Sequence, residues 1–286
     1  MTRSFTAMPL LADRLRLQQA CPYWRVLGID LLEWGRGRAV MRMAPSPRIA
    51  AGTDDARIDP LALVGMLDDS FSNAMATVLP LSIGISTLDL RMEFASAAPP
   101  TGAVTAETQV QLVGDTMITA HIMAHDEAGP IATGTSMFTL GGYPGGSLPD
   151  FGKIGLYDPV QATGPFRALI GLERAGDDAV LPGGNPNVIG WEGGPALHGG
   201  VIGAVLMESC LLRAAAEGEI AAGKRLASLY LRYLRPGSAL QTLRASSTVD
   251  RLGRSASFLS ARCFHDDGRD VGHAHAIFVP DEAAAA

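Results

Sequence analysis

The feature that most constrains the fold of this chain is an internal repeat with a period of about 140 residues. Its clearest part is residues 87–91 (TLDLR), which match residues 228–232 (SLYLR) at an offset of 141. Three further matches follow the same order at offsets of 139 or 140: the apolar segments that begin at Asp59 and His198, His125-Asp126 with His265-Asp266, and Phe138 with Phe278. Since the chain has 286 residues, the repeat predicts two copies of one unit.

Each copy is predicted to contain one apolar helix among strands. Residues 59–78 are apolar on nearly all sides of a helix, and Asp59 followed by Pro60 is a favourable N-cap and first turn. Strand-like runs are expected in the first half at residues 23–33, 37–44, 85–94, 103–113, 116–125 and 130–140. In the second half, a helix is expected near 198–217 and strands near 166–174, 227–235, 240–251, 255–265 and 270–279.

The best boundary between the copies is residues 141–152 (GGYPGGSLPDFG), which are rich in glycine and proline. We therefore predict a first unit at residues 1–143, a linker at 144–152 and a second unit at 153–286. The predicted fold class is α+β, with antiparallel sheets wrapped around central apolar helices.

Composition and charge exclude several classes of protein. A formal net charge of −6 argues against a general nucleic-acid binder, which needs a basic face. No apolar run reaches the roughly 18 residues of a membrane-spanning helix, and the first residues lack the apolar stretch of a secretory signal. Three widely separated cysteines fit a reducing cytosol rather than a disulfide framework. We expect a cytoplasmic protein without a nucleic-acid partner or a membrane span.

The segment that most suggests chemistry is His198-Gly199-Gly200, which opens the apolar helix of the second half. Glycine at a helix entry lets a ligand approach the backbone closely. The first N–H groups of a helix have no partner within the helix and suit an anion or a developing oxyanion. Alternatively, the two glycines only permit a tight turn against the sheet.

A buried helix opened by His-Gly-Gly and wrapped by an antiparallel sheet resembles the hotdog fold, and the motif is similar to that of the PaaI-like acyl-CoA thioesterases. The strand and turn at residues 231–237 (LRYLRPG) are also typical of the family. The resemblance covers nearly the whole chain as two fused hotdog units. It implies that the units pair through their sheets as a pseudo-dimer, and it allows a homodimer of the two-unit chain.

The resemblance also implies a site between two units. A glycine amide at one helix start polarises the thioester carbonyl, and a carboxylate on the other unit's helix acts as base or nucleophile. In the family this carboxylate follows the histidine by nine positions. Here Met207 holds that place in the second unit and Glu208 follows it, whereas Asp68, followed by Asp69, lies nine positions after Asp59.

One complete site is therefore expected per chain. It would combine His198, Gly199 and Gly200 with Asp68, assisted by Thr87. The other would combine Glu208 with Pro60, which has no N–H to donate, and is expected to be degenerate. Of the adjacent acids Asp68 and Asp69, at least one is expected to face solvent or to cap a neighbouring group. The residues expected to contact the substrate are Asp69, Glu208, Ser228, Arg232 and Arg235, with the arginines facing coenzyme A phosphates.

The leading hypothesis is hydrolysis of an acyl-CoA, which is a substrate, so that no cofactor is expected. No metal site is expected either, because His273 and His275 share a strand face without a third ligand. Two alternatives remain. One is a hotdog hydratase or dehydratase, of whose motif Asn185-Pro186-Asn187 is only a partial match. The other is a non-catalytic acyl-CoA-binding or scaffold protein, which the shifted acid of the second unit and Asp59-Pro60 would fit. Glu192 stands where some family members have an asparagine, which weakens the match around the carbonyl.

Overall fold

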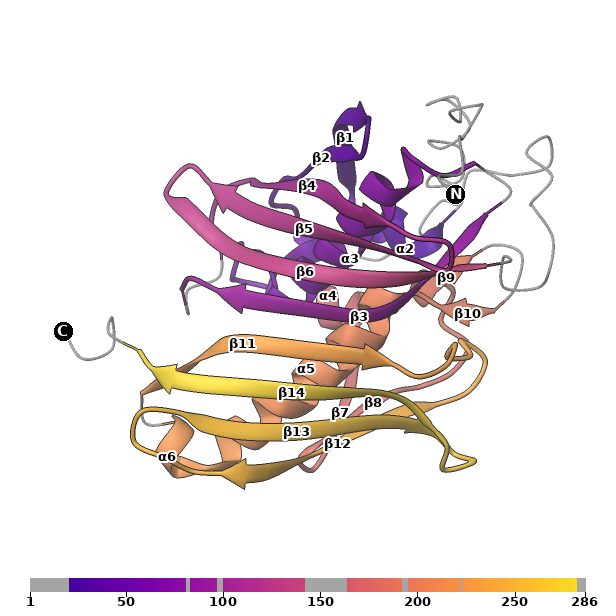
Figure 1. The fold of residues 1–286 in the computed structure, drawn as a ribbon. Coiled ribbons are helices and arrows are strands. Elements are labelled where there is room, and N and C mark those ends of the chain that lie inside the picture. The colour runs from indigo at the N-terminus through magenta and orange to yellow at the C-terminus, as the bar shows by residue number, and fades with distance from the viewer. Residues whose placement is uncertain are drawn as a thin grey trace.

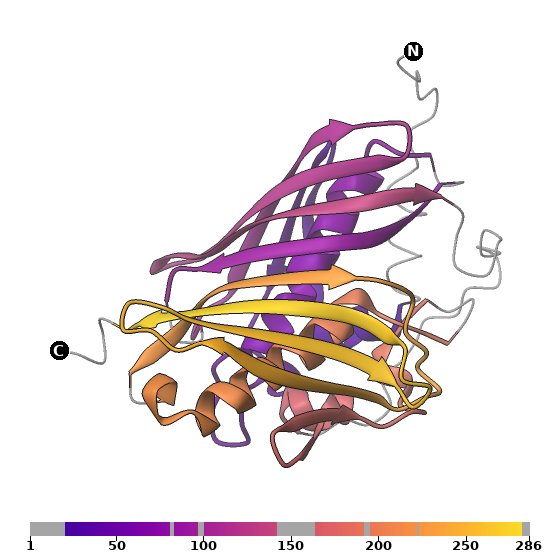
Figure 2. The ribbon, with the colours of Figure 1, turned by 60° about the horizontal axis from the view of Figure 1, so that its bottom comes forward.

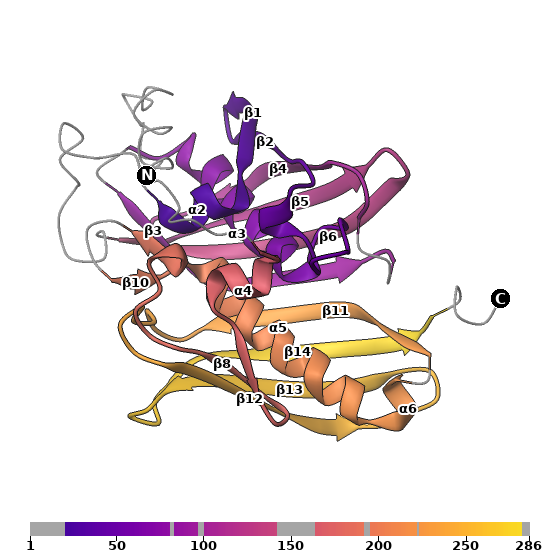
Figure 3. The same ribbon diagram turned by 180° about the vertical axis from the view of Figure 1, so that it is seen from behind.

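The computed structural model describes residues 21–80, 83–96, 100–141, 164–191, 195–221 and 223–281. Within these ranges the chain forms one large antiparallel sheet with its main helices on a single face (Figures 1 and 3). The predicted linker and the domain boundaries beside it lie outside the described residues, so they stay predictions.

The first half contains α2 (Pro22–Leu27), β1 (Ile29–Gly35), β2 (Arg38–Met43), the 3-10 turn η1 (Pro47–Ile49), α3 (Pro60–Ala76), β3 (Gly84–Phe94), β4 (Val104–Val113), β5 (Met117–Asp126) and β6 (Gly129–Gly141). The second half contains α4 (Phe166–Ile170), β7 (Glu173–Ala175), β8 (Asp178–Leu181), η2 (Pro186–Val188), β9 (Ile189–Trp191), β10 (Ala196–Leu197), α5 (Gly199–Ala216), α6 (Gly218–Ala221), β11 (Lys224–Tyr233), β12 (Leu243–Arg251), β13 (Ser257–His265) and β14 (Asp270–Pro280).

Twelve strands form one sheet in the order β1-β2-β4-β5-β6-β3-β11-β14-β13-β12-β8-β7. The first half supplies the first six and the second half supplies the rest, so the halves meet where β3 pairs with β11. In that pairing Met92 lies opposite Leu229 and Leu90 opposite Leu231, and all four side chains are buried. The chain is thus two fused hotdog units joined edge to edge as a pseudo-dimer, and the sheet curves around the helices (Figure 2).

The two long helices form the centre of the core. The carboxylate of Asp59 accepts a hydrogen bond from the Leu61 N–H at 2.9 Å and caps α3, whose first residue is Pro60. His198 caps α5 in the same way by accepting from the Gly200 N–H. α5 is long and apolar enough to pass a length-and-composition test for a membrane span, but 67% of it is buried inside the fold, as expected of a core helix.

Two predicted strands are wrong at their start. Residues 23–33 begin with helix α2 before β1, and residues 166–174 begin with helix α4 before β7. Each helix ends at a glycine with a positive φ, Gly28 at 63° and Gly171 at 73°, which is a common helix C-terminus. Their apolar and aromatic residues pack against the core as one buried helical face, which an alternating pattern does not reveal.

Candidate active site

A cavity of about 440 Å³ lies at the seam between the two units. The first unit contributes residues of α2, α3, β3 and β6, and the second contributes the start of α5 and the end of β11. Asp68, Thr87, His198 and Gly199, four of the five residues predicted to be catalytic, line this cavity. The fifth, Gly200, lies directly behind them in the first turn of α5.

Asp68 lies in the middle of α3 and is only 4% exposed. Its Oδ1 accepts a hydrogen bond from the Thr87 hydroxyl at 3.0 Å. A β-bulge between Thr87 and Asp89 shifts the register of β3 against β6, and Thr87 faces the cavity. Burial raises the pKa of Asp68 to about 6, although His198, Thr87 and the Gly200 amide act in the opposite direction.

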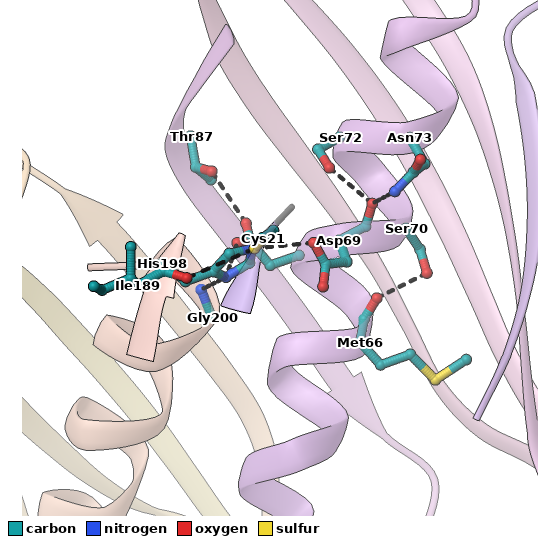
Figure 4. A network of polar contacts seen from close by, with 11 residues as sticks. Cys21, Met66, Asp69, Ser70, Ser72, Asn73, Thr87, Ile189, His198 and Gly200 are labelled. Carbon is teal, nitrogen blue, oxygen red and sulfur yellow. Dashed lines mark hydrogen bonds and ion pairs between the residues drawn. The ribbon is translucent and has the colours of Figure 1, made fainter. Parts of the chain in front are cut away.

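Asp69 is also buried, at 5% exposure, so neither of the adjacent acids faces solvent. Both carboxylates approach the same imidazole from across the seam. Asp69 Oδ1 lies 3.0 Å from His198 Nε2, and Asp68 Oδ2 lies 3.5 Å from His198 Nδ1. Figure 4 shows Asp69, His198 and Thr87 converging from three elements.

The ring of His198 is enclosed on its other sides. The Tyr23 ring packs against it with centroids 4.8 Å apart, and Nδ1 accepts a hydrogen bond from the Gly200 N–H at 3.0 Å. Burial disfavours the charged imidazolium, but the two carboxylates outweigh burial, with Asp69 the stronger, and raise the pKa of His198.

The start of α5 faces the Asp68 carboxylate directly. A Cβ on Gly199 would lie 2.7 Å from Asp68 Oδ2, so only glycine leaves room for the carboxylate there. Within the described residues, the Gly199 N–H has no hydrogen-bond partner, whereas the Gly200 N–H is used by His198. The structure therefore brings the backbone at the start of α5 next to a buried carboxylate.

Glu208, a predicted substrate contact, lies elsewhere. It is buried on α5 and forms ion pairs with Arg167 and, at 3.3 Å, with Arg174. Arg167 also holds Asp59 at 3.0 Å, so one guanidinium joins the cap of α3 to the acid of α5. Glu208, which was expected to belong to a degenerate second site, is thus part of a buried ion cluster.

The remaining predicted contacts divide into two groups. Arg235 lines the cavity near its exposed mouth, with Leu234 and Pro236. Ser228 and Arg232 do not line it, because they flank Leu229 and Leu231 on β11, whose side chains face the core. Alternation along a strand places Ser228 and Arg232 on the outer face of the sheet. Glu192 lies outside the described residues.

Sequence reasoning missed several residues of the cavity wall. Asn73 follows the catalytic candidates by one helical turn of α3, and Tyr233 lies at the end of β11. Spacing from Asp69 points to Asn73, because residues four positions apart share a helix face. Among the described residues, no cluster of His, Cys, Asp and Glu has the arrangement to hold a metal ion.

Comparisons with known proteins agree with this architecture. Residues 188–279 match the family model of the acyl-CoA thioesterase N-terminal domain. No curated protein matches the sequence at a significant level.

Solved structures of similar fold cover most of the chain at low sequence identity. The 12:0-ACP thioesterase from Umbellularia californica is 14% identical with a TM-score of 0.58, over 85% of this chain and 94% of that chain. The tesB protein of Mycobacterium avium subs paratuberculosis is 13% identical with a TM-score of 0.56, over 91% and 99%. An acyl-ACP thioesterase from Bacteroides thetaiotaomicron is 13% identical with a TM-score of 0.53, over 85% and 98%.

These likenesses show the fold, and residues 188–279 are similar to the acyl-CoA thioesterase N-terminal domain. The chain therefore has a tandem hotdog fold, and it is similar in fold to the thioesterases named above.

Proposed function

We propose that this chain hydrolyses acyl-CoA thioesters at a composite site, defined as Asp68 and Thr87 of the first unit with His198, Gly199 and Gly200 of the second. The observation that carries the proposal is the close approach of the buried Asp68 carboxylate to the Gly199 backbone at the start of α5. The family match and the shared fold support the same reaction.

In this proposal Asp68 is the general base. Its carboxylate takes a proton from water while the water oxygen bonds to the carbonyl carbon, and the carbonyl electron pair moves onto its oxygen. The intermediate then collapses, the C–S bond breaks, and the proton held by Asp68 passes to the sulfur of coenzyme A. Direct attack by Asp68 on the carbonyl carbon would instead break the C–S bond, release coenzyme A as its thiolate and leave an anhydride that water hydrolyses in a second step.

The Gly199 N–H is suited to hold the oxyanion. It points from the positive end of the α5 dipole and is not used by another group of the described chain. One such donor typically accounts for about 10²–10³ in rate. Thr87 keeps one oxygen of Asp68 in place, so the other faces the glycine.

The substrate is expected to enter at the exposed mouth, where Arg235 offers a cation for the phosphates of coenzyme A. The acyl group would then occupy the buried end beside Trp24 and Asn73. All three cysteines are free and buried, which fits a reducing compartment, and we place the reaction in the cytoplasm.

The test is hydrolysis of a panel of acyl-CoAs by the wild type, by Asp68→Asn and by Asp30→Asn, an exposed carboxylate of β1 far from the cavity lining. We expect Asp68→Asn to lower kcat by at least about 10²-fold and Asp30→Asn to leave it unchanged. Full activity of Asp68→Asn would remove this residue from the mechanism. Tight binding of acyl-CoA without turnover by the wild type would favour a binding protein instead.

A further inference from the structure

Two adjacent carboxylates on α3 face one imidazole, and their surroundings differ. Asp68 has the Thr87 hydroxyl and the start of α5 beside it. Asp69 Oδ1 contacts the Nε2 atom of His198 at 3.0 Å, while its Oδ2 is buried without a hydrogen-bond partner among the described residues. The bond to His198 is therefore the one side-chain hydrogen bond that Asp69 makes in the described chain.

The hydrogen bonds around the ring determine where its proton lies. The Gly200 N–H donates to Nδ1, so Nδ1 must carry a lone pair in the neutral ring. The proton is then on Nε2, where the Asp69 carboxylate accepts it. A carboxylate faces each ring nitrogen, but Asp69 is the closer, at 3.0 Å from Nε2 against 3.5 Å for Asp68 from Nδ1, and only Nδ1 also has a donor. The opposite tautomer would place the Nε2 lone pair against the closer carboxylate and lose the Gly200 bond.

The His198 side chain is packed both at its ring and at its base. Tyr23 lies against one face, and the backbone is close behind, since a Cβ on Gly190 would lie 2.7 Å from His198 Cα. The bond between Asp69 and His198 also crosses the seam, from the middle of α3 to the first turn of α5. It therefore ties the carboxylate-bearing helix to the backbone that carries Gly199.

We infer that Asp69 is a positioning residue, which holds His198 in its Nε2–H tautomer so that Nδ1 binds the Gly200 N–H and leaves the Gly199 N–H to the substrate. The catalytic consequence of this positioning role rests on the proposed function, whereas the tautomer of His198 does not depend on it. Asp69 also lines the cavity, so the expectation that it contacts the substrate stays a prediction beside this role. Asparagine at this position can present its amide N–H to Nε2 and favour the other tautomer, which disrupts the cap.

The experiment compares the wild type with Asp69→Asn by nitrogen NMR of the imidazole and by acyl-CoA hydrolysis over a range of pH. The groups that face the ring are Asp68 and Asp69 from α3 and Tyr23 from α2. We expect the neutral wild-type ring to show a single Nε2–H tautomer and the variant to show Nδ1–H. Misplacement of the site is expected to lower kcat about 10²-fold, with a smaller change in KM.

The acid limb of the pH profile separates positioning from folding. Removing the Asp69 charge lowers the pKa of both His198 and Asp68, since Asp69 raises both, so the limb is expected to move to lower pH. The matched control is Ser70→Ala, the next residue of α3, which is buried, bonds the Met66 carbonyl at 2.8 Å and does not contact His198. We expect its tautomer and acid limb to match the wild type.

The inference is overturned if Asp69→Asn keeps the Nε2–H tautomer, or if its loss of activity leaves the acid limb in place. If the wild type hydrolyses no acyl-CoA, the proposed function fails, and the tautomer measurement alone still decides the role of Asp69. Should Asp68→Asn abolish hydrolysis while Asp69→Asn behaves as wild type in both measurements, the proposed function stands and this inference fails.

Discussion

Asp68 is a carboxylate whose environment opposes its charged form. Burial raises its pKa from 3.8 to about 6. The folded state therefore favours the protonated acid more than the unfolded chain does. The raised pKa of Asp68 therefore adds to the free energy of unfolding in full below about pH 4. That contribution is lost as the pH rises through about 6, where the acid ionises inside the protein.

The direction of this pKa shift predicts how the stability of Asp68→Asn depends on pH. The variant has no charge to bury, so it is expected to be more stable than the wild type above about pH 6, by about 1–3 kcal/mol. The difference should shrink toward pH 4, where both side chains are neutral. Urea unfolding at the two pH values measures it, and a gain that is the same at both would show that the Asp68 charge is not the cause. A gain in stability above about pH 6, together with the expected loss of hydrolysis, would show that Asp68 serves the reaction at a cost in stability.

At the scale of the elements, the packing of α3 against α5 fixes how the two units lie against each other. The two helices can approach closely because Gly203 of α5 has no side chain between them. A Cβ on Gly203 would lie 2.8 Å from Leu231 Cδ1 and 2.9 Å from Val64 Cγ1, and both of these side chains are fully buried. Fully buried neighbours have little room to move away, so the helix crossing itself would have to shift.

Gly203→Ala is therefore expected to destabilise the protein by about 1–2 kcal/mol, although alanine is the better helix former. Gly218→Ala, at the start of α6, is the control, because nothing lies within 4 Å of its Cβ position. We expect Gly218→Ala to change the free energy of unfolding by less than about 0.5 kcal/mol. Equal stability of the two variants in urea unfolding would contradict the close packing of the helices.

The long elements were predictable from the sequence because their patterns are strong. The apolar run after Asp59-Pro60 and the one after His198 both became core helices, and the alternating runs from residue 85 onward became strands. α2 was not predicted, since Tyr23 and Trp24 are aromatic residues that favour strands. Pro22 at its first position and Gly28 at its end were the signals of a helix.

At the scale of the whole molecule, the site lies between the two units, so its residues could be predicted from the sequence only as far as the pairing of the units could. Asp68, His198 and Gly199 were predictable together because family spacing placed them on facing helices, and the structure brings them side by side. Which neighbour of Asp68 also turns inward was not predictable, because it depends on the rotation of α3 against α5. Arg167 has no distinctive pattern around it, so its contacts with both helices appear only in the folded chain.

The Arg167 cluster gives the last prediction. Its guanidinium balances two buried carboxylates, Asp59 of the first unit and Glu208 of the second. Arg167→Met keeps much of the apolar volume but leaves both carboxylates in the interior without this cation, since Arg174, at 65% side-chain exposure, contacts Glu208 alone. Breaking a buried pair in this way typically costs about 3–5 kcal/mol.

We expect that loss for Arg167→Met in urea unfolding at neutral pH, and a loss below about 1 kcal/mol for Arg174→Met, because the Arg174 cation is mostly exposed. Adding Glu208→Leu to Arg167→Met should recover part of the stability, since it removes one of the stranded charges. If the two arginine variants are equally stable, the cluster does not hold the units together. If the double variant is no better than Arg167→Met, burial of the Glu208 charge is not what destabilises it.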